Sequence, residues 1–345
     1  MVATPVDTVA SPPAAPSLRA AAGSRPARRR PGWMIVARKE FADHLLSLRF
    51  FLLLVLVGLS AVGAVHAASG RLRDVAPAAS DAPDVLLRLL TIVPEDLPSF
   101  ASFFGLVGFL SPLLGIAFGF DAINGERSQG TLPRLVSQPI HRDDVINGKF
   151  AAGLALIALT ICVLAALVVG VGIYRLGVTP DGEELLRLLI YLGVSIVYAG
   201  VWLALAVLAS VVVRRASTSA LLAIAAWLIF TVFSTMFAGL LADALADVPR
   251  DATFEQRLHN ARMEQTISRF SPETLYEEAS TALLLPEVRS LDILTQEDVD
   301  RAVAGELPLT QSLLVVWPQI TALVALIVVL FAAAYIVFLR QEIRA

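Results

Sequence analysis

A polar stretch separates two long apolar runs in the first half of the chain. From Asp121 to Phe150 it reads DAINGERSQGTLPRLVSQPIHRDDVINGKF, with basic residues, two prolines and a short amphipathic helical pattern. A simple connection between two membrane helices would be shorter and less structured. The stretch therefore indicates a surface that another protein binds on the cytoplasmic side of a membrane.

The chain as a whole is too apolar for a soluble domain. Of its 345 residues, 57% are hydrophobic and 17% are charged, and its mean hydropathy is +0.73, which is typical of a membrane protein. About 20 apolar residues cross a bilayer core of about 30 Å. The stretches of sufficient length are 50–68, 100–120, 150–174, 188–213, 216–241 and 313–339. We therefore expect an all-α integral membrane protein with six transmembrane helices.

The distribution of basic residues predicts the orientation of these helices. With both termini inside, the inner parts are 1–49, 121–149, 214–215 and 340–345. They hold 16 Lys and Arg against 8 Asp and Glu, whereas the outer parts hold 11 against 22. Because basic residues concentrate in cytoplasmic loops, we expect both termini and the loop 121–149 to lie in the cytoplasm.

The chain divides into four predicted regions. Residues 1–32 are rich in Pro, Ala, Ser and Arg and indicate a disordered cytoplasmic tail. Residues 33–241 form a membrane domain, which contains helices one to five and the loop 121–149. Residues 242–312 form a small helical extracytoplasmic domain between helices five and six. Residues 313–345 contain the sixth helix and the cytoplasmic C-terminus.

A helical pattern at 33–48 precedes the first span. Its apolar residues recur every three or four positions, and its charged residues fall largely on the other face. The apolar set is Trp33, Val36, Ala37, Phe41, His44, Leu45 and Leu48, and the charged set is Arg38, Lys39, Glu40 and Asp43. We interpret this segment as an N-terminal helix lying in the inner membrane interface. The alternative is a plain cytoplasmic extension of the first span.

The outer region 242–312 contains signals for short helices. Ser271 followed by Pro272 is typical of a helix start, with a capping residue before proline at the first helical position. The residues that would then share one apolar face are Leu275, Tyr276, Ala279, Ala282 and Leu283. The only cysteine of the chain, Cys162, lies inside the third apolar run, so the outer region folds without an intramolecular disulfide.

Sequence motifs for catalysis are absent. The chain has no His-Glu-x-x-His and no Gly-x-Ser-x-Gly pattern. Its apolar runs have no ionisable residue at mid-depth, where an ion-coupled carrier or an intramembrane enzyme would place one. Gly125 and Gly130 have the spacing of a phosphate-binding loop, but the required lysine is missing and no strand precedes them. We expect no catalytic, cofactor-binding or metal-binding residue here; ATP and Mg²⁺ would belong to another subunit.

Three short motifs in the loop resemble the cytoplasmic loop of ABC-2 type transporter permeases. They are Glu126-Arg127-Ser-Gln-Gly130-Thr131-Leu132, then Ser137-Gln-Pro139-Ile-His-Arg142, then Gly148-Lys149-Phe150. The N-terminal Ala37-Arg-Lys-Glu-Phe41 also resembles this family. The outer Ser271-Pro272-x-x-Leu275-Tyr276 is similar to a subgroup related to the NosY permeases. The resemblance covers nearly the whole chain after about residue 33.

The resemblance implies the membrane subunit of an ATP-driven transporter, most simply an exporter that works by alternating access. Its implied partners are two copies of a cytoplasmic P-loop ATPase, a second permease copy, the lipid bilayer and an extracytoplasmic protein at 242–312, with no nucleic acid. The implied location is the bacterial cytoplasmic membrane. The alternative is a non-transport complex that transmits force or signal to the extracytoplasmic partner.

The resemblance also implies roles for individual residues. A coupling helix that docks on the ATPase falls within 123–145, and its polar contacts would be Glu126, Arg127, Arg134, Arg142 and Asp143. The loop 214–217 would be a second, weaker contact. The alternative for these charges is a solvated loop with no partner.

Spans two and five from each half line the transport path in this family. The corresponding residues here are Phe104, Pro112, Phe230, Ser234 and Phe237. Such a surface would suit an amphipathic or apolar cargo. The alternative is that these residues serve helix packing alone.

Overall fold

The computed structural model describes residues 31–75, 85–93, 102–128, 130, 141–177, 180–246, 249, 251–293 and 307–341. Within these ranges the regular structure is helical, and six helices are long and apolar enough to cross a membrane. The prediction of an all-α protein with six spans is confirmed. All but the last two residues of the predicted tail 1–32 lie outside the described residues.

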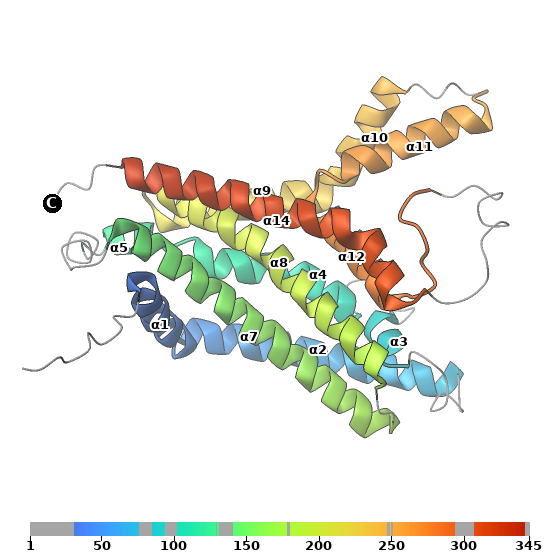
Figure 1. Cartoon of the computed structure of the whole chain (residues 1–345), viewed down its shortest axis with the longest axis horizontal. Helices are drawn as coiled ribbons and strands as arrows, with labels where there is room; N and C mark the ends of the chain where they lie inside the picture. The colour runs from blue at the N-terminus through green and yellow to red at the C-terminus, as the bar shows by residue number, and fades with distance from the viewer. Residues whose placement is uncertain are drawn as a thin grey trace, which may run out of the picture.

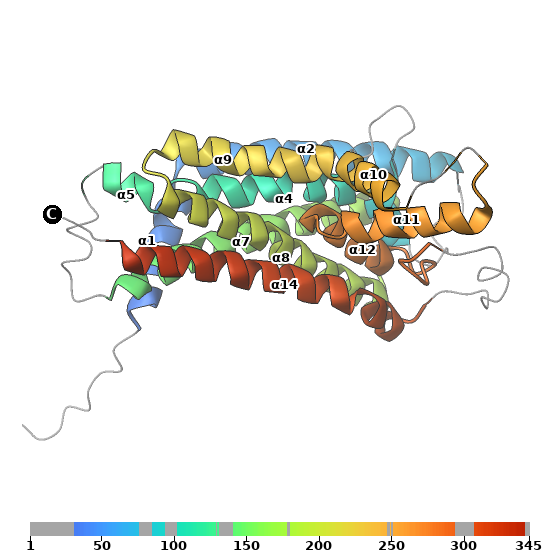
Figure 2. The ribbon, with the colours of Figure 1, turned by 90° about the horizontal axis from the view of Figure 1, so that it is seen from above.

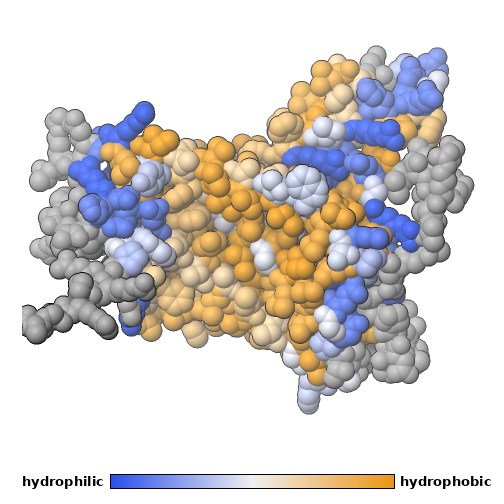
Figure 3. All heavy atoms as spheres, in the orientation of Figure 1, coloured by the Kyte–Doolittle hydropathy of each residue, from blue (hydrophilic) through white to orange (hydrophobic). Residues whose placement is uncertain are grey.

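The spanning helices run side by side between two polar ends. They are α2 (Leu48–Val75), α4 (Phe103–Gly119), α7 (Arg142–Leu176), α8 (Gly182–Val212), a composite fifth span and α14 (Leu309–Arg340); the fifth span joins α9 (Ala216–Leu228), a π-helical segment η3 (Ile229–Phe233) and α10 (Ser234–Leu245). An apolar band covers the middle of the surface, and hydrophilic residues gather at both ends (Figure 3). This pattern matches a protein embedded in a bilayer.

The shorter helices lie at the two ends of the bundle. Helices α1 (Gly32–Leu45) and α5 (Asn124–Ser128) gather at one end, and α3 (Val85–Thr91), α11 (Phe254–Ser268) and α12 (Pro272–Leu284) lie toward the other (Figure 1). Helix α1 lies across the direction of the spans rather than along it (Figure 2). The α10–α11 pair projects away from the bundle, whereas α12 returns to pack against it.

Helix α8 forms the centre of the bundle. It contacts α4, α7, α9, α12 and α14, and 72% of its most apolar stretch is buried, compared with 11% for the fifth span. Gly115 allows α4 to approach α8 closely, because a Cβ atom there would lie 2.5 Å from the Ala199 carbonyl oxygen. Small residues permit such close packing between membrane helices.

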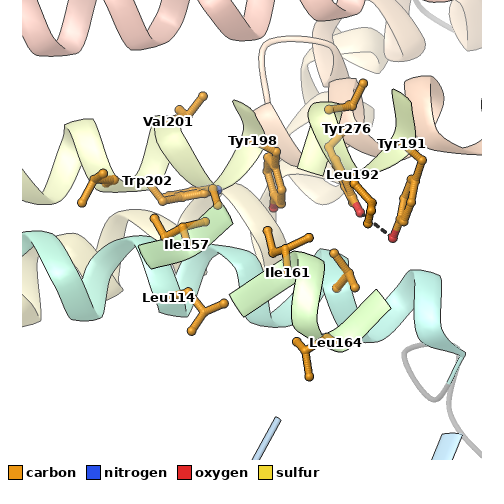
Figure 4. Close-up of a cluster of buried hydrophobic side chains, with 14 of the residues drawn as sticks. Leu114, Ile157, Ile161, Leu164, Tyr191, Leu192, Tyr198, Val201, Trp202 and Tyr276 are labelled. Carbon is orange, nitrogen blue, oxygen red and sulfur yellow. Dashed lines mark hydrogen bonds between the residues drawn. The ribbon is translucent and has the colours of Figure 1, made fainter. Parts of the chain in front are cut away.

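Helix α12 is anchored on α8 by Tyr276. Its ring stacks on Tyr198 with centroids 4.4 Å apart, and its hydroxyl donates to the Tyr191 hydroxyl over 3.0 Å (Figure 4). The predicted start of this helix is confirmed, since the Ser271 side chain accepts from the Glu273 N–H and Pro272 is the first helical residue. All five residues of the predicted apolar face are buried.

Buried charged residues hold together the end of the bundle opposite α1 and α5. Arg187 is 1% exposed; it donates to Glu183 on its own helix, to the Leu283 carbonyl at the end of α12 and to Ser312 on α14. Glu184 accepts from the Leu86 N–H, so it binds the start of α3. These contacts satisfy backbone groups and a buried charge that would otherwise be costly.

Two spans begin at least six residues earlier than the sequence predicted. Helix α7 begins at Arg142 instead of residue 150, and α8 begins at Gly182 instead of residue 188. Acidic residues explain both extensions, because carboxylates in the first turn stabilise the positive end of the helix dipole. These residues are Asp143 and Asp144 in α7, and Glu183 and Glu184 in α8. The last part of the predicted loop 121–149 is therefore helical.

The close packing of α4 on α8 leads to a stability prediction. Replacing Gly115 by Ala forces the new methyl group against backbone atoms of α8, and we expect a loss of about 1–3 kcal/mol, seen as a lower midpoint of thermal unfolding in detergent. Gly58→Ala on α2 is the matched control, because nothing lies within 4 Å of its added Cβ atom. Equal midpoints for both variants would contradict the packing described here.

Candidate functional site

The predicted coupling region lies at the end of the bundle where α1, α5 and the first turns of α7 meet. The end of α14 reaches the same place (Figure 1). Of the predicted range 123–145, the structure describes 123–128, 130 and 141–145. Arg134 lies outside the described residues, so its predicted role stays a prediction.

Lys149 forms the centre of a buried ionic cluster at this end. Its Nζ atom lies 3.0 Å from Glu40 Oε1 on α1 and 3.2 Å from Glu126 Oε1 on α5. The side chains of Lys149, Glu40 and Glu126 are 6%, 10% and 17% exposed. Lys39 also contacts Glu40, over 3.2 Å, but its side chain is 56% exposed. A single buried ammonium group thus joins three helices that are distant in the sequence.

The burial of Glu40 differs from the polar face that the sequence predicted for the N-terminal helix. The sequence placed Glu40 on the polar face of the segment 33–48, but the structure buries it beside Val36, one helical turn earlier. Residues four apart lie on the same helix face, so the spacing of Val36 and Glu40 indicates that Glu40 shares the buried face. Its buried partner, Lys149, could not be identified from the sequence because 108 residues separate the two.

Helix α1 packs directly on the first turns of α7. Asp144 accepts the Trp33 N–H over 2.9 Å and the His141 N–H over 3.3 Å, so one carboxylate serves the starts of both helices. At Gly148, a Cβ atom would lie 2.6 Å from the Val36 side chain and 2.7 Å from the Trp33 carbonyl oxygen. Glycine is needed here because it leaves room for the backbone of α1.

Two predicted coupling residues bind the end of α14. Arg127 donates to the Gln341 side chain and, over 3.4 Å, to the Val211 carbonyl at the end of α8. Arg142 donates to the Gln341 carbonyl over 3.3 Å. Gln341 in turn donates to the Val211 carbonyl over 2.9 Å. These arginines therefore join α5 and α7 to the ends of α8 and α14.

The predicted coupling residues that the structure describes thus lie at one end of the molecule. Glu126 belongs to the Lys149 cluster, Arg127 and Arg142 hold Gln341, and Asp143 is half-buried in the first turn of α7. Other basic residues at this end are exposed to solvent; they are Lys39, Arg340, Arg38, Arg214 and Arg215. The last two belong to the short loop that the sequence marked as a second contact.

The predicted path residues lie on α4 and on the fifth span, and their role stays a prediction. Phe104 stacks on Tyr276 with centroids 6.2 Å apart, and Pro112 is buried within α4. Phe230 and Phe237 on the fifth span are 36% and 48% exposed, and Ser234 is half-buried. A cavity between α2, α4 and α7 measures about 10 Å³, room for about one water molecule.

A carboxyl group lies where α12 meets the fifth span. The Ser271 hydroxyl donates to the Phe230 carbonyl over 3.0 Å, which satisfies a backbone oxygen in the π-helical segment η3. Glu273 lies next to this contact; its Oε2 atom is buried and has no hydrogen-bond partner among the described residues. Burial raises the pKa of Glu273 to about 7; the Thr231 hydroxyl partly offsets this effect and the Glu277 charge adds to it.

Metal binding finds no support in the part of the chain that the structure describes. Within it, no three side chains of His, Cys, Asp or Glu come close enough together to hold an ion. This geometry can transmit motion, because buried polar contacts hold the short helices against the ends of the spanning helices.

Comparison with known proteins gives consistent results. The family described as "ABC-2 family transporter protein" matches residues 34–343. The chain is 31% identical over 218 residues to the "Probable ABC transporter permease protein NosY" of Stutzerimonas stutzeri, covering 60% of this chain and 69% of that protein. It is 30% identical over 206 residues to the protein of the same name from Pseudomonas aeruginosa, covering 56% of this chain and 65% of that protein.

The shared cap at Asp144 leads to a prediction about α1. Asp144→Ala removes the acceptor for the Trp33 N–H, and loss of such a cap costs about 1 kcal/mol. We expect the α1 amides to exchange with deuterium roughly fivefold faster in the variant, measured by mass spectrometry in lipid nanodiscs. Asp143→Ala is the matched control and should leave α1 unchanged. Identical α1 exchange in the two variants would refute the cap.

The buried carboxyl group predicts a pH dependence. Because the pKa of Glu273 in the folded protein is about 7, above the ordinary 4.5, its ionisation opposes folding. The stability that the neutral Glu273 side chain contributes is therefore complete below pH 4.5 and is lost as the pH rises through about 7. We expect the midpoint of thermal unfolding to fall between pH 5 and pH 8, and Glu273→Gln to reduce that fall. Glu255→Gln, at an exposed position on α11, serves as control; an unchanged fall in Glu273→Gln would contradict the burial of this group.

Proposed function

Because the chain belongs to the ABC-2 family of transporter proteins, we propose that it is a permease subunit that exports its substrate by alternating access. In this family the membrane subunit is not itself an enzyme, and ATP is hydrolysed by a partner ATPase subunit. The observation that carries the proposal is the family match from residue 34 to residue 343. The polar end formed by α1, α5 and the first turns of α7, here called the clamped end, adds a surface on which a partner ATPase can act.

The partner ATPase would dock at the end formed by α1, α5 and the first turns of α7. Exposed arginines surround this end, and the orientation expected from basic residues places it in the cytoplasm. ATP and Mg²⁺ would bind to the ATPase, with one ATPase subunit for each permease copy. Closure of two ATPase subunits would move the docked helices and rock the spans between inward and outward openings.

The fifth span would face a second copy of the chain. Only 11% of its most apolar stretch is buried, compared with 56% in α4 and 72% in α8, the two spans that it contacts. Phe233, Met236 and Phe237 are exposed together on this span. A homodimer would cover this surface and would bring Phe230, Ser234 and Phe237 of both copies to a shared path.

The projecting segment 254–270, which contains α11, would serve as a contact for an extracytoplasmic protein. It extends beyond the apolar band (Figure 3), and the Phe254 and Phe270 side chains are 69% and 79% exposed. Large apolar side chains exposed outside the membrane are typical of protein interfaces. This contact would add a partner to the permease without changing its transport role.

Copurification tests the docking of the ATPase. We expect a tagged chain, purified from bacterial membranes, to retain a P-loop ATPase identified by mass spectrometry. Arg142→Glu places a negative charge on the docking surface and should reduce the retained ATPase by roughly fivefold or more.

The control separates docking from internal packing. Gln341→Ala removes the side-chain partner of Arg127, keeps the backbone carbonyl that Arg142 contacts and adds no charge, so the ATPase should be retained. Equal loss in both variants would show that packing at the end of α14, and not the added charge, controls the retention of the ATPase. Full retention in Arg142→Glu, or no ATPase with the unmodified chain, would overturn the proposed docking.

A further inference from the structure

We propose that Lys149 is a positioning residue that holds α1, α5 and the first turns of α7 as one rigid unit. Its ammonium group is the described contact that joins Glu40 of α1 to Glu126 of α5, and it belongs to the helix that continues into the third span. A force applied to α5 would then move α1 and α7 together. The part of this inference that concerns ATPase coupling rests on the proposed function.

The short helix α5 depends on side-chain contacts for its position. It has five residues, too few to be stable alone. On one side, the Ser210 hydroxyl accepts the N–H groups of Ile123 and Asn124, over 2.9 and 3.2 Å, and ties the start of α5 to α8. On the other side, Glu126 binds Lys149. Loss of the second contact would leave α5 attached to α8 but free to move relative to α1.

Charge burial gives this contact its strength. Glu40 and Glu126 are both shielded from solvent, so without Lys149 two carboxylates would face each other in a site of low dielectric constant. Removing one partner of a buried ionic cluster is far more costly than losing an exposed ion pair. Lys39 contacts the same oxygen of Glu40 from the exposed side and cannot replace Lys149, since it does not reach α5 within the described contacts.

The dense packing of α1 on α7 supports a unit that moves as one body. Gly148, next to Lys149 in the sequence, brings the backbones of the two helices into contact, and Asp144 caps both. Lys149 extends this pair to α5 in the same layer. The ionic cluster therefore lies between the predicted docking loop and the third span. A movement of the loop would reach the third span through this cluster.

The first test measures rigidity directly in the chain alone. Spin labels at Arg38→Cys on α1 and Ser128→Cys on α5, both exposed positions, are introduced with Cys162→Ser in lipid nanodiscs. We expect a narrow distance distribution with Lys149 present, a clearly broader one in Lys149→Met and a narrow one in Lys39→Met, the matched control. A distribution that stays narrow in Lys149→Met overturns the proposal.

The second test measures coupling in the complex with the copurified ATPase. In Lys149→Met, the stimulation of ATP hydrolysis by the permease should fall roughly fivefold, while the amount of bound ATPase stays within about twofold. Lys149→Arg should restore part of the stimulation, because it keeps the charge between the two carboxylates.

A neutral variant separates positioning from simple charge repulsion. Lys149→Met combined with Glu40→Gln and Glu126→Gln leaves no buried charge, so a loss of stimulation in this variant shows that the ionic contact itself is needed. Full stimulation there overturns the coupling role. If the unmodified chain binds no ATPase, the proposed function fails, and the spin-label distances still decide whether Lys149 holds the unit.

Discussion

A buried charge or a buried backbone polar group is costly unless it finds a partner within the protein. In this chain that constraint acts where helices stop, bend or change type. Ser210 accepts the amides at the start of α5, Ser271 donates to the carbonyl of Phe230 in the π-helical segment, and Arg187 binds the end of α12. Each side chain joins two segments that are distant in the sequence. The hydrogen bonds that satisfy these backbone groups therefore also hold the tertiary fold.

The molecule has a well-packed body and a less covered edge. Helix α8 is the centre of the body, and α4, α12 and α14 pack around it through glycine contacts and the stack of Tyr276 on Tyr198. The fifth span forms the edge, and α14 is only slightly more covered, with 11% and 17% of their most apolar stretches buried. Such an arrangement suits a subunit that completes its path with a second copy and receives motion at its polar end.

The sequence predicted what depends on local pattern. The six spans follow from the length of the apolar runs, and the start and buried face of α12 follow from Ser271, Pro272 and the helical spacing after them. It could not predict contacts between distant residues, such as Lys149 with Glu40, or the use of Arg127 and Arg142 to hold Gln341. Those depend on which helix ends meet in space, and a cytoplasmic basic residue looks the same in sequence whether it binds another protein or its own chain.

The orientation of the clamped end is the most direct test of this account, because a cytoplasmic ATPase can act only on a surface that faces the cytoplasm. A single cysteine at Ser128, in a chain with Cys162→Ser, can be probed with a membrane-impermeant maleimide. We expect Ser128→Cys to be labelled in inside-out membrane vesicles and protected in intact cells. Phe254→Cys on α11 should be labelled in intact cells and protected in inside-out vesicles. Labelling of Ser128→Cys from outside intact cells would contradict this account.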